Sequence, residues 1–375
     1  MIRPARWLIG LGLVTAGVLA LTAAGIGGRV FMVAAAVAVL PLPLYVGVVL
    51  WLDRFEPEPR HLLAIAFLWG ASVAVVVSGL VNGIMEAVAG PEWSALASAP
   101  VGEEALKAVV LVWIYRARRD EFDGVVDGVI YAAMVGLGFA FAENVDYYGR
   151  ALQQGGSGGL AVTFTLRGMV APFSHPLFTA MTGLGLGVAR QSGSRAAALA
   201  APVAGFAGAV ALHALWNAGA SAGLFFFVIY ATVMIPALLL LFVIVAVSLK
   251  FEGRIIRAQL APEAAAGLLT AAEYASLCSV RGRMHASTTA LRQGGFAAWR
   301  ERRAFHRAAS ELAFLRRRAV VDGVEPDRAL EAQYLRGLGA ADHGAGPSGS
   351  PDRLRQGYGA SAEALRAKAE GPPSS

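Results

Sequence analysis

Cysteine and charge are both scarce in this sequence. Its 375 residues include one cysteine, Cys278. A single thiol excludes an intramolecular disulfide framework and a zinc site built from several cysteines. Charged residues make up 15% of the chain, whereas soluble domains carry roughly 25%. With 56% hydrophobic residues and a mean hydropathy of +0.56, the composition indicates a membrane protein.

An excess of positive charge is absent from the first two thirds of the chain. Residues 1–249 carry 13 Lys and Arg against 13 Asp and Glu, whereas residues 250–375 carry 19 against 13. The net charge of +6 therefore lies in the tail. This placement favours a polybasic segment beside anionic lipid, and we expect no nucleic-acid partner. A basic helix predicted at 297–320 is equally compatible with a solvated face.

Long apolar runs predict an all-α fold, a polytopic membrane helix bundle of about eight transmembrane helices with a short helical, partly disordered cytoplasmic tail. The first run, residues 7–27, exceeds the 7–15 residues of a signal-peptide core, so we expect a retained helix. Pro41 and Pro43 predict a kink in the second span. The Gly- and Gln-rich stretch 153–159 predicts a flexible loop. The predicted spans are 7–27, 30–52, 61–82, a fourth from 94 or 100 to 115, 124–148, 174–189, 196–219 and 224–249, with an interfacial approach at 160–173.

Domain organisation and orientation follow from the same pattern. We expect a membrane-embedded domain at 1–250, a basic helical extension at 251–338 and a disordered tail at 339–375. Lys and Arg concentrate in the loops that face inside when the N-terminus is inside. The sequence therefore predicts a multi-pass protein of the plasma membrane with both termini in the cytoplasm.

A run of charged residues interrupts the fourth predicted span. Glu103, Glu104 and Lys107 lie in an otherwise apolar stretch that continues to Tyr115. A charged side chain at the centre of a membrane helix costs at least about 2.5–3.5 kcal/mol, so the three groups need partners or a wet cavity. Positions i, i+3 and i+4 share one helix face. We interpret this stretch as part of an active site inside the membrane.

Later spans supply further polar groups at a similar depth. At 1.5 Å per residue, Glu103 and the groups on the next three spans lie within about 5–12 Å of the outer surface. His213 and Asn217 share a helix face because they are four residues apart. The predicted catalytic set is Glu103, Glu104, Glu143, His175, His213 and Asn217, with Lys107 and Asn144 in supporting roles.

Structural interpretations of single residues compete with this one. The two adjacent acids also suit the first turn of a helix, and His213 with Asn217 also suits hydrogen bonding between helices. Asp127 and Arg167 are interpreted as structural or topological residues. Two further functions use the same residues differently: a proton- or ion-coupled transporter, or a non-enzymatic scaffold that recruits a partner through its basic tail. The absence of an internal repeat weighs against a transporter built from inverted halves.

Four short motifs in a fixed order carry a family resemblance. They are Glu-Glu-x-x-Lys at 103–107, Phe-x-x-x-Glu-Asn at 139–144, Ser-His-x-x-Phe-Thr at 174–179 and His-x-x-x-Asn at 213–217. In this order they resemble the PrsW family of intramembrane proteases, and the similarity covers about residues 40–250. That family belongs to a wider superfamily with the CAAX prenyl endopeptidases and bacteriocin-immunity-type membrane proteins. The resemblance implies cleavage of a membrane-anchored protein, such as an anti-sigma factor, near the outer membrane face.

Two mechanisms fit these residues. In one, Glu103 or Glu104 activates water together with a histidine, and His213 with Asn217 stabilises the oxyanion. In the other, a zinc ion held by His175, His213 and Glu143 activates the water. The motif His-Glu-x-x-His is absent from the sequence, and the sequence leaves both mechanisms open.

Overall fold

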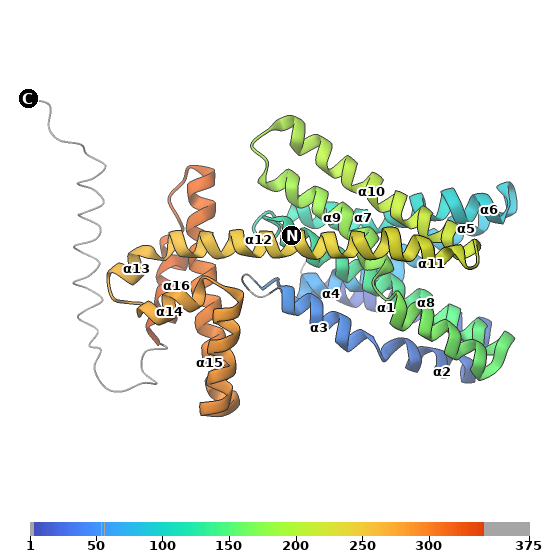
Figure 1. Ribbon diagram of the computed structural model, residues 1–375, viewed down its shortest axis with the longest axis horizontal. Coiled ribbons are helices and arrows are strands. Elements are labelled where there is room, and N and C mark those ends of the chain that lie inside the picture. The colour runs from blue at the N-terminus through green and yellow to red at the C-terminus, as the bar shows by residue number, and fades with distance from the viewer. Residues whose placement is uncertain (1–3, 54, 56, 341–375) are drawn as a thin grey trace, which may run out of the picture. The chain divides into compact units, whose positions relative to one another are not determined.

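A computed structural model of the chain describes residues 4–53, 55 and 57–340. All regular secondary structure in these residues is helical, as predicted for an all-α protein (Figure 1). Contacts divide the chain into two compact units, Met1–Ser248 and Leu249–Ser375. The predicted disordered tail lies outside the described residues from residue 341 onward.

The first unit is a bundle of long helices joined by short turns. Four π-helical turns, labelled η, directly follow α-helices. The elements are α1 (Pro4–Ile26), α2 (Gly28–Val39), α3 (Leu42–Leu52), α4 (Arg60–Trp69), η1 (Gly70–Ala74), α5 (Val75–Ala89), α6 (Pro91–Trp93), η2 (Ser94–Ser98), α7 (Ala99–Ala117), α8 (Val125–Phe164), η3 (Thr165–Val170), α9 (Ser174–Gln191), α10 (Arg195–Ser221), α11 (Phe225–Ile229), η4 (Tyr230–Met234) and α12 (Ile235–Gln259), which continues into the second unit.

Six segments of the described chain are long and apolar enough to cross a membrane. The sequence predicts about eight, and two features account for the difference. One segment, residues 125–191, contains both α8 and α9. Helix α7 is not among the six, and it carries four charged residues, Glu103, Glu104, Lys107 and Arg116.

Helix α8 lies at the centre of the unit. It packs against α9, α2, α4 and η1, and α9 packs in turn against α10. Its residues from Val125 to Phe139 are almost all buried, which explains why this span reads as continuously apolar. Asp127 accepts hydrogen bonds from the backbone N–H groups of Asp123 (2.9 Å) and Gly124 (2.7 Å), so it caps the start of α8.

Two sequence predictions about helix breaks have different outcomes. The predicted kink at Pro41 is present as the break between α2 and α3. The predicted flexible loop at 153–159 is wrong, because these residues are helical except at Gly156. Gly156 has φ 61°, a left-handed value that glycine adopts without a Cβ penalty. One glycine therefore interrupts the helix where composition suggested a seven-residue loop.

The second unit contains α13 (Ala261–Ala265), α14 (Ala271–Leu277), α15 (Val280–Asp322) and α16 (Arg328–Ala340). Helix α15 is interrupted at Gly295 (φ 67°), and the part after this break covers the predicted basic helix at 297–320. Arg316 forms ion pairs with Glu263 at 2.8 Å and Glu331 at 2.7 Å. At least this arginine of the basic tail therefore connects α13, α15 and α16.

Close contact between α8 and α9 depends on a pair of glycines. A Cβ atom on Gly183 would overlap the carbonyl oxygen of Gly128, and a Cβ atom on Gly128 would overlap that of Gly183. Because the overlapped atoms are backbone, neither helix can accommodate a side chain by changing a rotamer. The distance between α8 and α9 is therefore set by the absence of side chains at these positions.

We expect Gly183→Ala to lower the free energy of unfolding by about 1–3 kcal/mol, the usual cost of overpacking. The matched control is Gly79→Ala, where a Cβ atom has open space. There the better helix propensity of alanine is expected to leave stability unchanged or raise it by up to about 1 kcal/mol. Unfolding of both variants in the same detergent measures the difference, and equal effects would contradict the close contact.

Candidate functional site

Four helices contribute polar side chains to one buried cluster in the first unit. Helix α7 contributes Glu103, Glu104 and Lys107, whereas α9 and α10 contribute His175 and His213. All five side chains are buried, with Glu104 and Lys107 fully inaccessible. Helix α8 adds Glu143, which contacts His175. The structure thus brings together residues separated by up to 110 positions in sequence.

Lys107 lies at the middle of this cluster. Its Nζ atom is 2.8 Å from Oε1 of Glu104, 3.7 Å from Oε2 of Glu103 and 3.0 Å from Nδ1 of His175. The ammonium also lies 3.7 Å from the centroid of the Phe139 ring, in a cation–π contact. A buried charge is tolerated only when it is paired, and Lys107 has two carboxylates, an imidazole and an aromatic face.

In each of the two histidines, one ring nitrogen contacts a carboxylate and the other faces the rest of the cluster. Nδ1 of His213 lies 3.1 Å from Oε1 of Glu104, and Nε2 of His175 lies 2.9 Å from Oε2 of Glu143. A carboxylate that accepts one ring N–H fixes the tautomer and orientation of an imidazole. The Phe178 ring stacks on His213 with the ring centroids 5.0 Å apart. Both imidazoles are therefore oriented by hydrogen bonds and packing.

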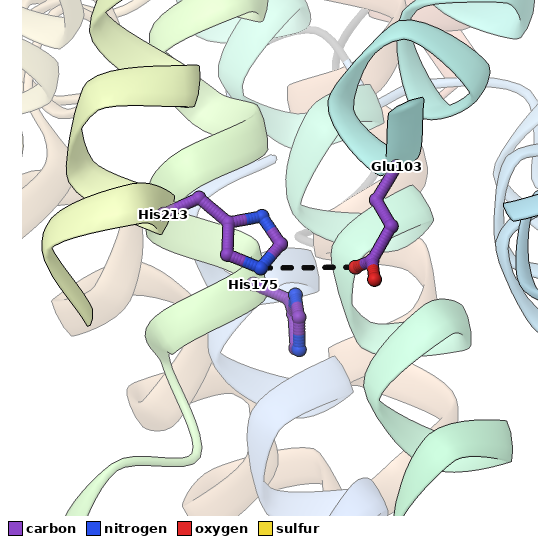
Figure 2. A group of neighbouring side chains, drawn as sticks. All are labelled: Glu103, His175 and His213. Atoms are coloured by element: carbon purple, nitrogen blue, oxygen red, sulfur yellow. Dashed lines mark ion pairs between the residues drawn. The ribbon is translucent and has the colours of Figure 1, made fainter. Parts of the chain in front are cut away.

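Glu103, His175 and His213 form a group that could hold a metal ion. One possible ligand atom from each residue lies within 4.8 Å of the other two (Figure 2). Nε2 of His213 is 3.7 Å from Oε2 of Glu103. That buried oxygen has no hydrogen-bond partner among the described residues. Two imidazoles and a carboxylate are the ligand set of one common class of catalytic zinc site.

The carboxylate in this group differs from the one predicted. The sequence suggested Glu143 as the third ligand, whereas the structure groups Glu103 with the two histidines. Glu143 has another contact, because its Oε2 atom lies 2.5 Å from Nη2 of Arg167 as well as 2.9 Å from His175. Glu143 therefore lies behind His175, and Glu103 lies on the side of His213.

The two predicted amides lie at the margin of the cluster. Asn217 is one turn beyond His213, and its Nδ2 donates to the backbone oxygen of Ala95 in η2 at 2.8 Å. Asn144 accepts a hydrogen bond from Nε of Arg167 at 2.7 Å. Among the described residues, neither amide side chain forms a hydrogen bond with Glu103, Glu104 or the histidines, so both connect the cluster to neighbouring elements.

Three residues outside the predicted catalytic and supporting set contact the cluster. Nδ2 of Asn82 in α5 donates to Oε1 of Glu103 at 3.1 Å, and Oγ1 of Thr179 donates to Oε2 of Glu104 at 3.1 Å. Arg167 contacts Glu143. Thr179 lies four residues after His175, so helical spacing offered a signal for it. Asn82 and Arg167 are single polar residues on other elements, and no local spacing connects them to the site.

Comparison with known proteins gives an independent result. Residues 58–245 match a family described as "PrsW family intramembrane metalloprotease". A protein named Protease PrsW from Geobacillus kaustophilus (strain HTA426) is 33% identical over 141 residues, which are 37% of this chain and 58% of that protein. The alignment thus spans less than two thirds of that relative. No solved structure matches the chain.

The matched region includes every residue of the cluster. Helices α7, α8, α9 and α10 all lie between residues 58 and 245, and so do the six predicted catalytic residues. The match covers half of the 375 residues. The chain therefore belongs to the PrsW family.

Proposed function

We propose that this protein is an intramembrane endopeptidase that hydrolyses a peptide bond in a membrane-anchored protein. One observation carries the proposal: three carboxylates, two imidazoles and a lysine from four helices meet inside an apolar bundle. Burying such groups is costly, and a bundle held only by packing has no need of them. Membership of the PrsW family supports the same activity.

Glu103 is proposed as the base that activates water. Its Oε2 atom has no hydrogen-bond partner among the described residues, whereas Oε1 accepts from Asn82. Oε2 takes a proton from water, the water oxygen attacks the peptide carbonyl carbon, and the proton passes to the leaving nitrogen as the C–N bond breaks. Nε2 of His213 lies 3.7 Å from that oxygen, where it can share the proton.

Glu104 and Lys107 are proposed to maintain this arrangement. Glu104 accepts from Lys107, from Thr179 and from the Nδ1–H group of His213. Because Nδ1 of His213 carries the proton, its Nε2 lone pair is directed toward Glu103. Both oxygens of Glu104 are thus occupied, which suits it to orientation and leaves proton transfer to Glu103.

The donor atoms also fit a divalent cation. Glu103, His175 and His213 would hold it, and Glu104 and Glu143 would stand behind the two imidazoles, as carboxylates commonly do behind metal-bound histidines. Glu103 would then be a ligand and not the base, and a bound zinc ion would activate the water instead, by supplying Lewis acidity and lowering the pKa of water. For His175 to take part, Lys107 must give up its contact with Nδ1.

The substrate and topology are proposed from the family and from charge. A single-span protein of the anti-sigma-factor type, cut near the outer face of the plasma membrane, fits a site at the depth expected from the sequence. The bias of Lys and Arg toward one set of loops supports an orientation with both termini in the cytoplasm. Reporter fusions after residue 53 and after residue 90 would test this orientation.

We expect Glu103→Gln to reduce kcat/KM by about 10²–10⁴-fold, because the amide cannot take a proton from water. The assay uses purified protein in lipid nanodiscs and a tagged single-span substrate, with the cut mapped by mass spectrometry. Glu92→Gln is the matched control, since Glu92 is exposed on the short helix α6. Normal cleavage by Glu103→Gln would show that another group is the base.

Removal of metal is expected to lower the cleavage rate by about tenfold or more, with recovery on adding Zn²⁺, because the two-histidine and carboxylate set suits catalytic zinc. Metal content is measured on the same samples before and after chelation. Full activity in a metal-free preparation would contradict a role for a bound cation and leave Glu103 and His213 as the groups that activate water.

A further inference from the structure

Arg167 connects to the cluster from outside the predicted motifs. It lies in η3, the π-helical turn that precedes α9, where a structural or topological role is the simplest expectation from sequence. Its side chain instead turns toward α8. Nη2 donates to Oε2 of Glu143 at 2.5 Å, Nε donates to Oδ1 of Asn144 at 2.7 Å, and the guanidinium lies 3.9 Å from the centroid of the Tyr147 ring.

These contacts extend a hydrogen-bond chain with a defined direction. The ammonium of Lys107 can only donate, so Nδ1 of His175, at 3.0 Å, accepts from it. The proton of the neutral imidazole is then on Nε2, which donates to Oε2 of Glu143 at 2.9 Å. The same oxygen accepts from Arg167. Glu143 is thus held from two sides, by His175 and by Arg167.

We propose that Arg167 is a positioning residue that acts on His175 through Glu143. By holding the carboxylate against Nε2–H, it keeps the ring of His175 turned so that Nδ1 faces Lys107. Lys107 sets the tautomer only in that orientation, and a ring released from Glu143 can turn away so that neither nitrogen is fixed as the acceptor. The inference deepens the proposed function, because it assigns a residue to the maintenance of that site. It adds a residue on η3 to a site whose carboxylates, imidazoles and lysine lie on α7, α8, α9 and α10.

The geometry of the contacts requires arginine in particular. One planar guanidinium reaches two different side chains, Glu143 and Asn144, and stacks on Tyr147. An ammonium group is a compact point charge and cannot reproduce that combination. Lysine at this position is therefore expected to restore the charge without fixing the direction of the carboxylate.

A merely structural role makes a different prediction. An arginine that anchors a helix at the membrane surface extends its head group toward water and lipid phosphates. The Arg167 side chain is only 20% exposed, and its donors are directed at side chains of α8. Loss of an anchor lowers stability without changing which nitrogen of His175 carries a proton. The tautomer of His175 therefore distinguishes the two roles.

The experiment measures that tautomer directly in the full-length protein. Histidine is labelled with ¹⁵N, the protein is placed in lipid nanodiscs, and NMR separates Nε2–H from Nδ1–H imidazoles. His175→Asn identifies the His175 signal. The variants are Arg167→Gln and Arg167→Lys, and the matched control is Arg150→Gln. Arg150 lies on α8 and forms an ion pair at 2.8 Å with Asp146 of that helix, where both side chains are partly exposed.

We expect His175 to be the Nε2–H tautomer in the wild type and in Arg150→Gln, and a mixture of tautomers in Arg167→Gln. Cleavage by Arg167→Gln should show kcat lowered by about 10–100-fold, the usual effect of losing an outer partner of a site histidine, with KM within about twofold. Arg167→Lys should lie between the wild type and Arg167→Gln, both in the tautomer of His175 and in kcat.

An unchanged His175 signal in Arg167→Gln would overturn the proposal, whatever the effect on cleavage. If Arg167→Gln does not fold, Arg167→Lys decides, and a wild-type signal and rate in that variant would also overturn it. The tautomer is read without any substrate. Failure of the wild type to cleave would therefore contradict the proposed function while leaving the role of Arg167 open to this measurement.

Discussion

The site depends on the contacts of one buried group, the ammonium of Lys107. It joins Glu104 on its own helix to His175 on another, and it lies against the ring of Phe139 on a third. Removing one partner of such a buried ion pair leaves an uncompensated charge, which typically costs about 3–5 kcal/mol. The same contacts that make α7 tolerable inside an apolar bundle therefore fix α7, α8 and α9 relative to one another.

Around this centre, polar groups are arranged in layers. Each imidazole that faces the interior has a carboxylate behind it, Glu104 for His213 and Glu143 for His175. Glu143 has Arg167 behind it in turn. Such outer partners set the orientation of the inner groups, and a site of this kind tolerates little movement. The glycine contact between α8 and α9 adds rigidity between two of the same helices.

Much of the candidate site could be predicted because its signals are local. Glu103, Glu104 and Lys107 stand out as charges within an apolar run, and their spacing places them on one face. The sequence predicts Glu143 as the carboxylate ligand of a metal, whereas the structure groups Glu103 with the histidines. Asn82 and Arg167 contact carboxylates of the cluster from separate elements, and nothing in their neighbourhoods indicates it.

The sequence alone determined the helical class, the membrane environment and the short sets of polar residues, because composition and the 3.6-residue period are properties of each segment by itself. Tertiary structure decided which carboxylate faces which imidazole and which of them meets an arginine. Those pairings depend on the rotation and depth of one helix against the next. Packing between side chains and close backbone contacts set both, and no single segment contains that information.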